Sequence, residues 1–229
     1  MNSSNPGRVL ISGGASGLGA AVVRAVADAG GKPYVLDRDP VEGDHRLVDV
    51  ADTAAVTEAV TELGRQTGGF DAVVTAAGWD QPGRLADVPA DRWDRVVHID
   101  LLGTAAVIRA ALPFLPIGGG GHIVTVASTL GLRAVSDATA YCAAKFGVVG
   151  FTRALAVELA GQVGVTLLIP GGMRTAFFDG RTEQYRPSAD AALNDPANVA
   201  AAVLFALSQP PGCAVRELVV CPDTEPSYP

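Results

Sequence analysis

Three residues carry a hydroxyl, a phenol and an amine at a spacing that could serve one small site. Tyr141 and Lys145 are four positions apart, and Ser128 precedes Tyr141 by 13 positions. Residues i and i+4 of a helix share one face, so the phenol and the ammonium can meet there. A phenol with a pKa of about 10 transfers protons poorly at neutral pH, but a nearby cation lowers that pKa. The trio predicts a proton-transfer site, although Tyr–Lys pairs at this spacing also occur on ordinary amphipathic helices.

A glycine-rich segment follows the first apolar run of the chain. It reads Ser12-Gly13-Gly14-Ala15-Ser16-Gly17-Leu18-Gly19 and lies between a predicted strand and a predicted helix. Glycines allow the backbone to approach a ligand closely, and the amino end of the following helix offers N–H groups to a phosphate. Doubly wound sheets bind nucleotides at this position. The segment predicts a dinucleotide-binding loop, and the alternative is a flexible turn.

An acidic residue ends the second predicted strand. Asp37 follows Gly19 by 18 positions, where a carboxylate is expected to bond the adenosine ribose hydroxyls. The same carboxylate repels the additional phosphate of NADP, whereas Arg38 could attract it. Ser16 adds no cation to the glycine loop. These residues favour NAD over NADP, and the alternative is that Asp37 only forms a turn.

Short apolar runs alternate with longer helical patterns along most of the chain. Strands are predicted at residues 8–12, 33–37, 47–49, 71–76, 122–127, 165–169 and 216–221. Helices are predicted at residues 18–29, 53–66, 91–112, 140–160 and 196–207. Strands that are apolar throughout indicate burial on both faces, and strand–helix alternation predicts a parallel sheet covered by helices on both sides. We expect an α/β, doubly wound Rossmann fold with about seven parallel strands.

The chain shows no internal repeat and no linker, so we expect a single domain over residues 1–229. Residues 175–195 interrupt the strand–helix alternation and exceed the usual length of a connection. Long loops on a rigid sheet often form lids or binding sites. This segment is therefore the predicted substrate-binding loop.

Composition and charge exclude several classes of function. The chain has 229 residues, a net charge of −7 and no run of basic residues, so we expect no nucleic-acid partner. It shows no signal-peptide pattern and no stretch of 18 apolar residues, so no membrane partner is expected. Three irregularly spaced cysteines argue against a disulfide framework and favour the cytoplasm. The three histidines are scattered, and no metal site is predicted.

Taken in order, these motifs resemble the short-chain dehydrogenase/reductase family in its short single-domain form. The resemblance runs from about Arg8 to Thr175. The glycine loop is similar to the family's Thr-Gly-x-x-x-Gly-x-Gly, with Ser12 in place of Thr. Further matches are the Asp-Val pair, the Ala-Ala-Gly end of a strand motif, the catalytic trio and the Pro-Gly-x-x-x-Thr motif, at Asp49-Val50, Ala76-Ala77-Gly78, Ser128/Tyr141/Lys145 and Pro170-Gly171 to Thr175.

The resemblance implies reversible hydride transfer between a nicotinamide and a secondary alcohol or ketone. Tyr141 would be the general acid/base, Lys145 would stabilise its phenolate and bind the nicotinamide ribose, and Ser128 would hold the substrate oxygen. The implied cofactor-binding residues are Ser12, Gly13, Ser16, Gly17, Leu18, Gly19, Asp37, Arg38, Asp49, Val50, Ala76, Ala77, Gly78, Tyr141, Lys145, Pro170, Gly171 and Thr175. Trp79, Phe177 and Phe178 are candidates for lining an apolar substrate pocket, or they pack locally.

One departure from the family concerns the support of the lysine. Many members carry an asparagine in the long helix after the fourth strand, and Asp100 occupies that position here. A carboxylate near Lys145 would partly offset the lysine's effect on Tyr141, so the phenol pKa would fall less. We therefore expect Asp100 to act with the catalytic trio and the oxidation optimum to shift to alkaline pH. The alternative is that Asp100 is an ordinary helix residue.

A second departure lies at the carboxyl end. Residues 218–223 lack the glycines that often follow the family's last strand, which weakens the case for the usual tetramer contact. A homodimer through the predicted helices at 91–112 and 140–160 is the other expectation, alongside a homotetramer. Their apolar faces may equally be core-facing, as such patterns usually are.

Two alternatives to an alcohol dehydrogenase or ketoreductase stay open. The fold also supports lyase or epimerase chemistry, and a dinucleotide sensor without catalysis is conceivable. A sensor would be expected to lose Tyr141 or Lys145, and both are present. The sequence does not identify the small-molecule substrate.

Overall fold

A parallel sheet forms the centre of the molecule in the computed structural model, which describes residues 5–228. Its seven strands follow the order β3-β2-β1-β4-β5-β6-β7, and each neighbouring pair is parallel. The strands are β1 (Arg8–Ser12), β2 (Lys32–Asp37), β3 (His45–Leu47), β4 (Ala72–Thr75), β5 (Gly121–Val126), β6 (Val163–Pro170) and β7 (Glu217–Val220). The predicted doubly wound fold, with seven parallel strands, is confirmed.

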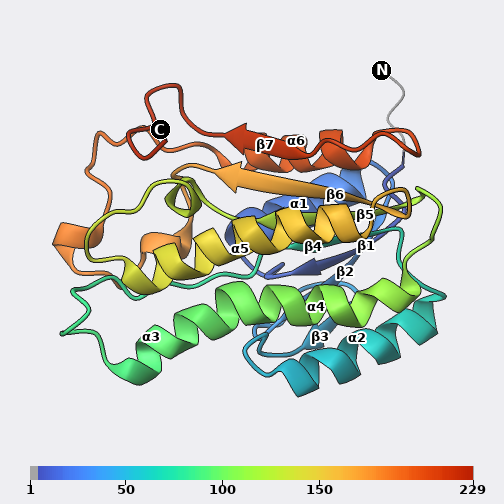
Figure 1. Ribbon diagram of the computed structural model, residues 1–229, viewed down its shortest axis with the longest axis horizontal. Coiled ribbons are helices and arrows are strands. Elements are labelled where there is room, and N and C mark those ends of the chain that lie inside the picture. Colours follow the sequence, from blue (N-terminus) through green and yellow to red (C-terminus); the bar gives the residue numbers. More distant parts are fainter. Residues whose placement is uncertain (1–4, 229) are drawn as a thin grey trace.

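Helices cover both faces of the sheet (Figure 1). They are α1 (Gly17–Asp28), α2 (Thr53–Thr67), α3 (Ala90–Val97), α4 (Thr104–Ala111), α5 (Thr139–Glu158) and α6 (Pro196–Leu207). α1 and α6 pack together on one face, and α2, α4 and α5 cover the other. Each helix begins and ends within one or two residues of its predicted bounds, apart from the predicted helix at 91–112.

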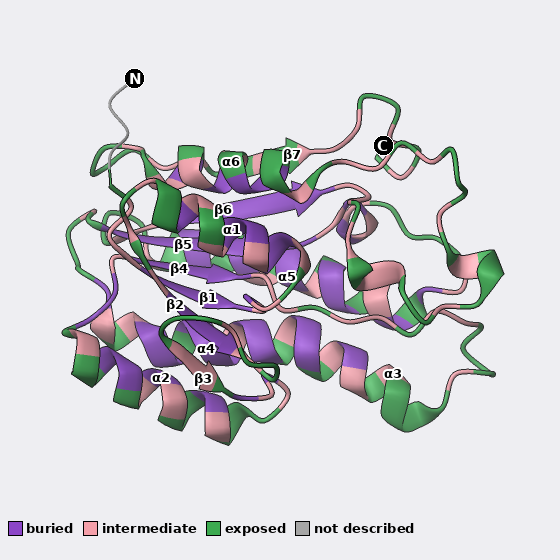
Figure 2. Cartoon of the chain, turned by 180° about the vertical axis from the view of Figure 1, so that it is seen from behind, coloured by how far each residue is buried: buried purple, intermediate pink, exposed green. Residues whose placement is uncertain are grey.

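The inner strands are mostly apolar because each face of the sheet has its own core. Along β1, Leu10 belongs to the core under α2, α4 and α5, whereas Val9 and Ile11 belong to the core under α1 and α6. Successive strand residues point to opposite faces, so both sets must be hydrophobic. Figure 2 shows the result as buried strands between layers of helices that expose only their outer faces.

The predicted helix at 91–112 contains an interruption. Between α3 and α4 the chain forms a π-helical segment, η1 (His98–Gly103), and Asp100 lies within it, fully buried. A single 3₁₀ turn, Leu112–Phe114, ends the run. Wider π turns insert a residue into an α-helix and often mark functional sites. The sequence prediction of one regular helix was wrong here, because a π segment has no signature in the pattern of apolar residues.

Two helical stretches, 90–114 and 139–158, are long and apolar enough by composition to cross a membrane. In this fold about half of each stretch is buried inside the protein. α4 and α5 contribute Val107, Ile108 and Leu155 to the core beside the sheet. Their apolarity is therefore accounted for by packing on the sheet.

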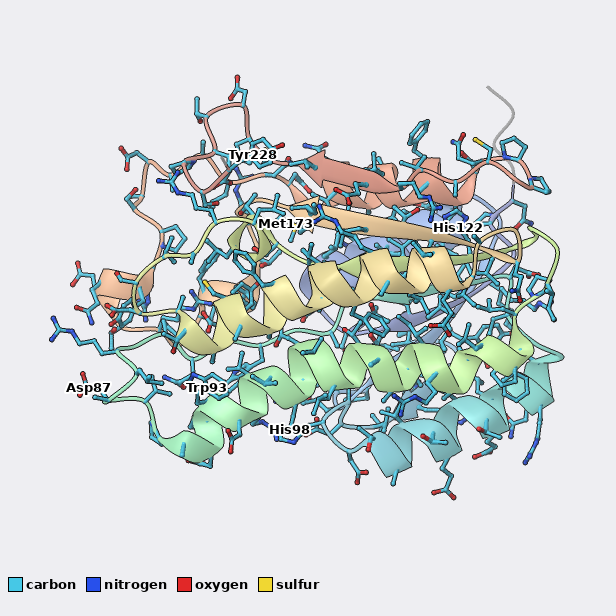
Figure 3. All side chains as sticks on the ribbon, in the orientation of Figure 1. Asp87, Trp93, His98, His122, Met173 and Tyr228 are labelled. Carbon is cyan, nitrogen blue, oxygen red and sulfur yellow. The ribbon has the colours of Figure 1, made fainter. Side chains whose placement is uncertain are left out.

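The carboxyl ends of the strands form one edge of the sheet, and the loops that follow β1 and β4 meet there. The order of strands reverses between these two, which is where open parallel sheets bind ligands. Met173 lies at this edge, while His122 lies at the opposite end of the sheet (Figure 3). The 175–195 segment also lies beyond this edge and contains only two short 3₁₀ turns, Ala176–Phe178 and Glu183–Tyr185.

Candidate active site

A cavity of about 610 Å³ opens at the carboxyl edge of the sheet. It brings together most residues that the sequence singles out, from the ends of strands β1 to β6 and from helix α5. The predicted residues that line it are Gly13, Ser16, Gly17, Leu18, Asp37, Arg38, Asp49, Val50, Ala76, Ala77, Gly78, Trp79, Ser128, Tyr141, Lys145, Pro170, Gly171, Thr175, Phe177 and Phe178. Ser12, Gly19 and Asp100 lie behind this wall.

The glycine loop connects β1 to α1 and has no room for side chains at two positions. Gly13 has φ +76°, and a Cβ there would lie 2.6 Å from the backbone of Ala77. A Cβ on Gly19 would overlap the carbonyl oxygen of Gly13. The Ser16 side chain makes no capping hydrogen bond to α1, so it does not occupy the helix's amino end. This cradle fits a pyrophosphate that approaches the backbone and the helix N-terminus.

Asp37 closes the same end of the cavity. One carboxylate oxygen accepts a hydrogen bond from the Ala15 N–H at 2.9 Å, and the other accepts from the Asp39 N–H at 3.1 Å. Asp37 is thus fixed beside the glycine loop. The guanidinium of Arg38 is exposed and lies 3.7 Å from the carboxylate of Asp39, so a carboxylate already faces its charge.

Asp49 is held by a partner that the sequence does not reveal. Its Oδ2 accepts a hydrogen bond from Arg95 at 2.7 Å, and its Oδ1 accepts from the Ala51 N–H at 3.0 Å. Burial raises the pKa of Asp49, but these two donors outweigh burial and lower it. Asp49 therefore lines the cavity as an anion, and Arg95 lines it too.

The predicted trio is assembled at the other end of the cavity. Ser128 follows β5, and its Oγ accepts a hydrogen bond from the Leu130 N–H at 3.1 Å. Tyr141 and Lys145 lie on α5, one turn apart, with the lysine Nζ 5.4 Å from the centre of the phenol ring. Lys145 is 4% exposed and donates to the Val126 carbonyl at 3.1 Å.

Asp100 lies behind the lysine and is in contact with it. Its Oδ1 is 3.0 Å from Lys145 Nζ, and its Oδ2 accepts a hydrogen bond from the Trp79 N–H at 3.0 Å. The π-helical turn η1 presents Asp100 to the interior, where Thr104 Oγ1 donates to its carbonyl at 2.8 Å. Asp100 is therefore more than an ordinary helix residue, because it forms a buried ion pair with the lysine of the trio.

These neighbours set the charge states of the trio. Burial raises the pKa of Tyr141; Lys145 and a hydrogen bond with Ser128 oppose that rise, while Asp100 adds to it. Burial alone would lower the pKa of Lys145, but Asp100 and Tyr141 outweigh burial and hold it above the ordinary value. The site thus keeps an ammonium beside a phenol that is protonated at neutral pH.

Aromatic residues of the 175–195 segment close the cavity over Tyr141. The Phe177 ring lies 5.7 Å from the Tyr141 ring, and Phe178 packs edge-on against Phe177 at 5.5 Å. Thr175 starts this 3₁₀ turn by accepting a hydrogen bond from the Phe177 N–H. Trp79 lines the cavity and also packs against the core.

Four other cavity residues escape sequence reasoning. Asp80 and Arg181 form a buried ion pair, with Arg181 Nη2 3.0 Å from Asp80 Oδ2. Glu225 and Ser227 come from the carboxyl-terminal segment, where Glu225 accepts a hydrogen bond from the Gly172 N–H at 2.9 Å. Arg181 is one of two arginines in the 175–195 segment, with Arg186, and nothing in the sequence distinguishes it or pairs it with Asp80.

Metal chemistry has no assembled ligand set in the structure. Within residues 5–228, no three His, Cys, Asp or Glu side chains are grouped to hold an ion. His98 and His122 lie on different elements, far apart in Figure 3. The groups that surround the cavity are those of a proton-transfer site next to a phosphate cradle.

Comparisons with known proteins give the same picture. The family model for short chain dehydrogenases matches residues 8–186. An uncharacterized oxidoreductase of Staphylococcus aureus is 31% identical over 226 residues, covering 93% of this chain and 96% of the relative. D-beta-hydroxybutyrate dehydrogenase of Cupriavidus necator is 32% identical over 190 residues, covering 76% of this chain and 73% of the relative.

Solved structures agree at the level of the whole chain. A short chain dehydrogenase from Burkholderia cenocepacia, in complex with NADP, superposes with a TM-score of 0.85 at 26% identity, covering 96% of this chain and 98% of that one. The fold, the site and the extent of the family match therefore agree, and this chain belongs to the short-chain dehydrogenase family of oxidoreductases.

Proposed function

We propose that this protein transfers hydride reversibly between NAD and a secondary alcohol or ketone, with Tyr141 as the general acid/base. One observation carries the proposal: a single cavity holds the phosphate cradle and Asp37 at one end, and Tyr141 with the buried Lys145 at the other. A general acid/base must be held within reach of the reacting oxygen and carry the proton that the reaction needs. Burial raises the pKa of Tyr141, so the phenol keeps the proton that reduction requires.

The residues present fit a dinucleotide. The loop turns so tightly that a Cβ at Gly13 or Gly19 would meet the protein's own backbone, and this tight turn leads into the amino end of α1, which can bind a phosphate. Asp37 lines the same cavity, where it would bond the ribose hydroxyls. Asp49 and Val50 flank the adenine end. When bound, the nicotinamide accepts or supplies the hydride, while the protein supplies the proton and the geometry.

The proton path follows from the contacts of the trio. In the reductive direction the Tyr141 hydroxyl donates its proton to the carbonyl oxygen, and the oxygen is held by the Ser128 hydroxyl. The phenolate that remains is stabilised by the ammonium of Lys145, whose position is fixed by Asp100 and the Val126 carbonyl. In the oxidative direction the phenolate removes the alcohol proton, so oxidation requires Tyr141 to be ionised first.

The preference for NAD rests on charge at the end of β2. The additional phosphate of NADP would approach the fixed carboxylate of Asp37, and Arg38 is already paired with Asp39. The Burkholderia relative was solved with NADP, so membership of the family leaves the choice open. Steady-state kcat/KM for NADH and NADPH tests the proposal: NADH should be preferred, and a clear preference for NADPH would overturn it.

The substrate end of the cavity favours an uncharged molecule with an apolar part. Its wall contains Trp79, Phe177 and Phe178, and its two cations, Lys145 and Arg181, each have a carboxylate partner. The hydroxybutyrate dehydrogenase of Cupriavidus acts on an acid, but within residues 5–228 no unpaired cation lies at this end to bind one. Reduced-nicotinamide absorbance should therefore respond to neutral secondary alcohols more strongly than to matched 3-hydroxy acids.

We also propose that residues 1–229 act as one domain, of which residues 1–4 and 229 lie outside the described part, and that 175–195 forms its substrate loop.

A homodimer through α4 and α5 is the proposed assembly. Leu102, on η1 just before α4, and Phe146, on α5, are 42% and 44% exposed, which leaves apolar surface for a second copy. Light scattering of the Phe146→Glu variant should then report a monomer where the parent protein reports a dimer.

A further inference from the structure

A second buried ion pair lies at the substrate end of the cavity, apart from Asp100 and Lys145. Arg181 Nη2 is 3.0 Å from Asp80 Oδ2, and the two side chains are 12% and 6% exposed. Asp80 follows β4, whereas Arg181 belongs to the 175–195 loop, 101 positions later. The pair therefore ties the substrate loop to the sheet.

Arg181 also holds the aromatic wall in place. Its guanidinium lies 4.7 Å from the centre of the Phe177 ring and 4.9 Å from that of Phe178. Phe177 in turn lies 5.7 Å from the Tyr141 ring. Arginine stacks on aromatic faces through its planar, weakly hydrated head. A continuous set of contacts thus runs from Asp80 through Arg181 and Phe177 to the proposed acid/base.

The pair is incompletely satisfied, which argues against a purely stabilising role. Asp80 Oδ1 and Arg181 Nε are buried and have no hydrogen-bond partner among the described residues. Two buried charges that share a single hydrogen bond recover less of their desolvation cost than a fully hydrogen-bonded pair would. An apolar pair of similar size would close the loop at lower cost. The presence of an ion pair here, in place of an apolar pair, therefore points to a role of the two charges at the neighbouring Tyr141 site.

We propose that Asp80 and Arg181 are positioning residues that form a clamp, which holds the aromatic wall of the substrate loop over Tyr141. The pair also exposes the Tyr141 phenol to two opposite charges whose effects on it offset each other. The proposal rests on the proposed role of Tyr141. The clamp fixes where the apolar part of the substrate lies, so it acts on substrate binding. The charge balance acts on proton transfer, so it sets the pH at which the site works.

Several groups face the phenol, and the test must separate them. Asp80 raises the pKa of Tyr141, as burial does, while Lys145 lowers it. The facing groups are Lys145 on α5, Asp100 on η1, Ser128 after β5, Asp80 after β4 and Arg181 on the loop, and Asp179 and Glu225 also line the cavity. Neutralising either member of the clamp leaves the other charge without its partner.

The experiment follows the pH dependence of kcat/KM for alcohol oxidation. Asp80→Asn leaves Arg181 unopposed and should move the rising limb of the profile, which reports ionisation of Tyr141, to lower pH by roughly 0.5 to 1 unit. Arg181→Met leaves Asp80 unopposed and should move it to higher pH by a similar amount. The double variant should return the limb close to that of the parent protein. Opposite shifts that cancel are a result that a merely structural role does not produce.

A further variant separates the clamp from the charge. Arg181→Lys keeps the cation but loses the planar head that stacks on Phe177 and Phe178. It should leave the limb near the parent position and raise KM for the substrate about tenfold, while kcat changes little. The matched control is Glu217→Gln, which breaks the exposed ion pair between Arg153 and Glu217. It should change neither the limb nor KM.

Phenolate absorbance gives a readout that does not need turnover. Ultraviolet pH titration of each variant, differenced against the same variant carrying Tyr141→Phe, reports Tyr141 alone and should show the same order of pKa values. Shifts in one common direction, or no shift in folded single variants, would overturn the proposal. Correctly ordered titrations in a protein without alcohol oxidation would sustain the charge balance and reject the proposed function instead.

Discussion

Lys145 Nζ lies 3.0 Å from Asp100 Oδ1, and both side chains are buried, with Lys145 in the cavity wall and Asp100 behind it. A carboxylate that touches the lysine offsets part of the positive charge that Tyr141 would otherwise experience. The phenol consequently keeps its proton to higher pH than an unopposed ammonium would allow.

Replacing Asp100 with Asn should make Tyr141 more acidic. The amide keeps an oxygen for Trp79 N–H but removes the negative charge beside Lys145, so the rising limb of the oxidation profile should move to lower pH by about one unit. The measurement is kcat/KM against pH for alcohol oxidation. Circular dichroism on the same samples checks that the fold persists, and an unchanged profile in a folded variant would contradict the offset.

Replacing Tyr141 with Phe should abolish turnover and spare the cofactor site. The phenol oxygen is the proposed proton donor, and loss of a general acid/base costs about 10²- to 10⁴-fold in rate. The ring itself, which packs on Phe177 at 5.7 Å, is retained. Fluorescence titration with NADH should give a Kd close to that of the parent protein. Substantial remaining activity would remove Tyr141 from its proposed role.

Replacing Asp37 with Asn should improve the use of NADPH. The amide oxygen can still accept from the Ala15 N–H, which holds the glycine loop, while the charge that repels the additional phosphate is gone. We expect kcat/KM for NADPH to rise about tenfold, equivalent to roughly 1.4 kcal/mol. Asp44→Asn, an exposed residue paired with Lys32, serves as the charge-matched control. If both variants respond equally, the effect is one of net charge.

His122 predicts how stability depends on pH. It is buried, and its Nε2 lies 2.9 Å from Thr166 Oγ1, whose hydrogen is donated to the Val215 carbonyl. Nε2 is therefore the donor to Thr166. Burial lowers the pKa of His122 to about 4, from 6.5. The unfolded chain thus binds more protons between these values, so stability is complete above pH 6.5 and declines as the pH falls towards 4.

Urea denaturation between pH 7 and pH 5 measures this loss. His122 contributes at most about 3 kcal/mol to the free energy of unfolding, because each unit of pKa shift corresponds to about 1.4 kcal/mol. His122→Gln should be less stable at neutral pH and should show a flatter pH dependence in this interval. A parent protein whose stability is constant over the same interval would refute the assignment.

The sequence is enough to predict the elements whose signals are local. β1 is apolar from Val9 to Ile11 because Leu10 and Ile11 face different cores, and the glycine loop must lie between β1 and α1. The Tyr141–Lys145 pair follows from helical spacing alone. Because all strands of the sheet are parallel, the loops that follow them lie together at its carboxyl edge.

The parts that escaped prediction depend on contacts between distant segments. Asp80 and Arg181 are 101 positions apart, and neither belongs to a recognisable motif. Arg95 on α3 bonds Asp49, which lies in the connection between β3 and α2. Glu225 reaches Gly172 across the cavity mouth. Each requires the folded chain to bring its partners together, and side-chain pairing of this kind leaves no periodic trace in the sequence.

The π-helical turn between α3 and α4 has a consequence for aligning and engineering this chain. Such a turn holds one residue more than a regular helix needs. Deleting Leu101 or Leu102 would restore a continuous helix but rotate its two halves by about 100° relative to each other. Either Asp100 would turn away from Lys145, or Val107 and Ile108 would leave the core. The position of the Asp100 carboxylate thus depends on the number of residues in this segment as well as on their types. A sequence alignment that places a one-residue gap here would match Asp100 to the wrong residue.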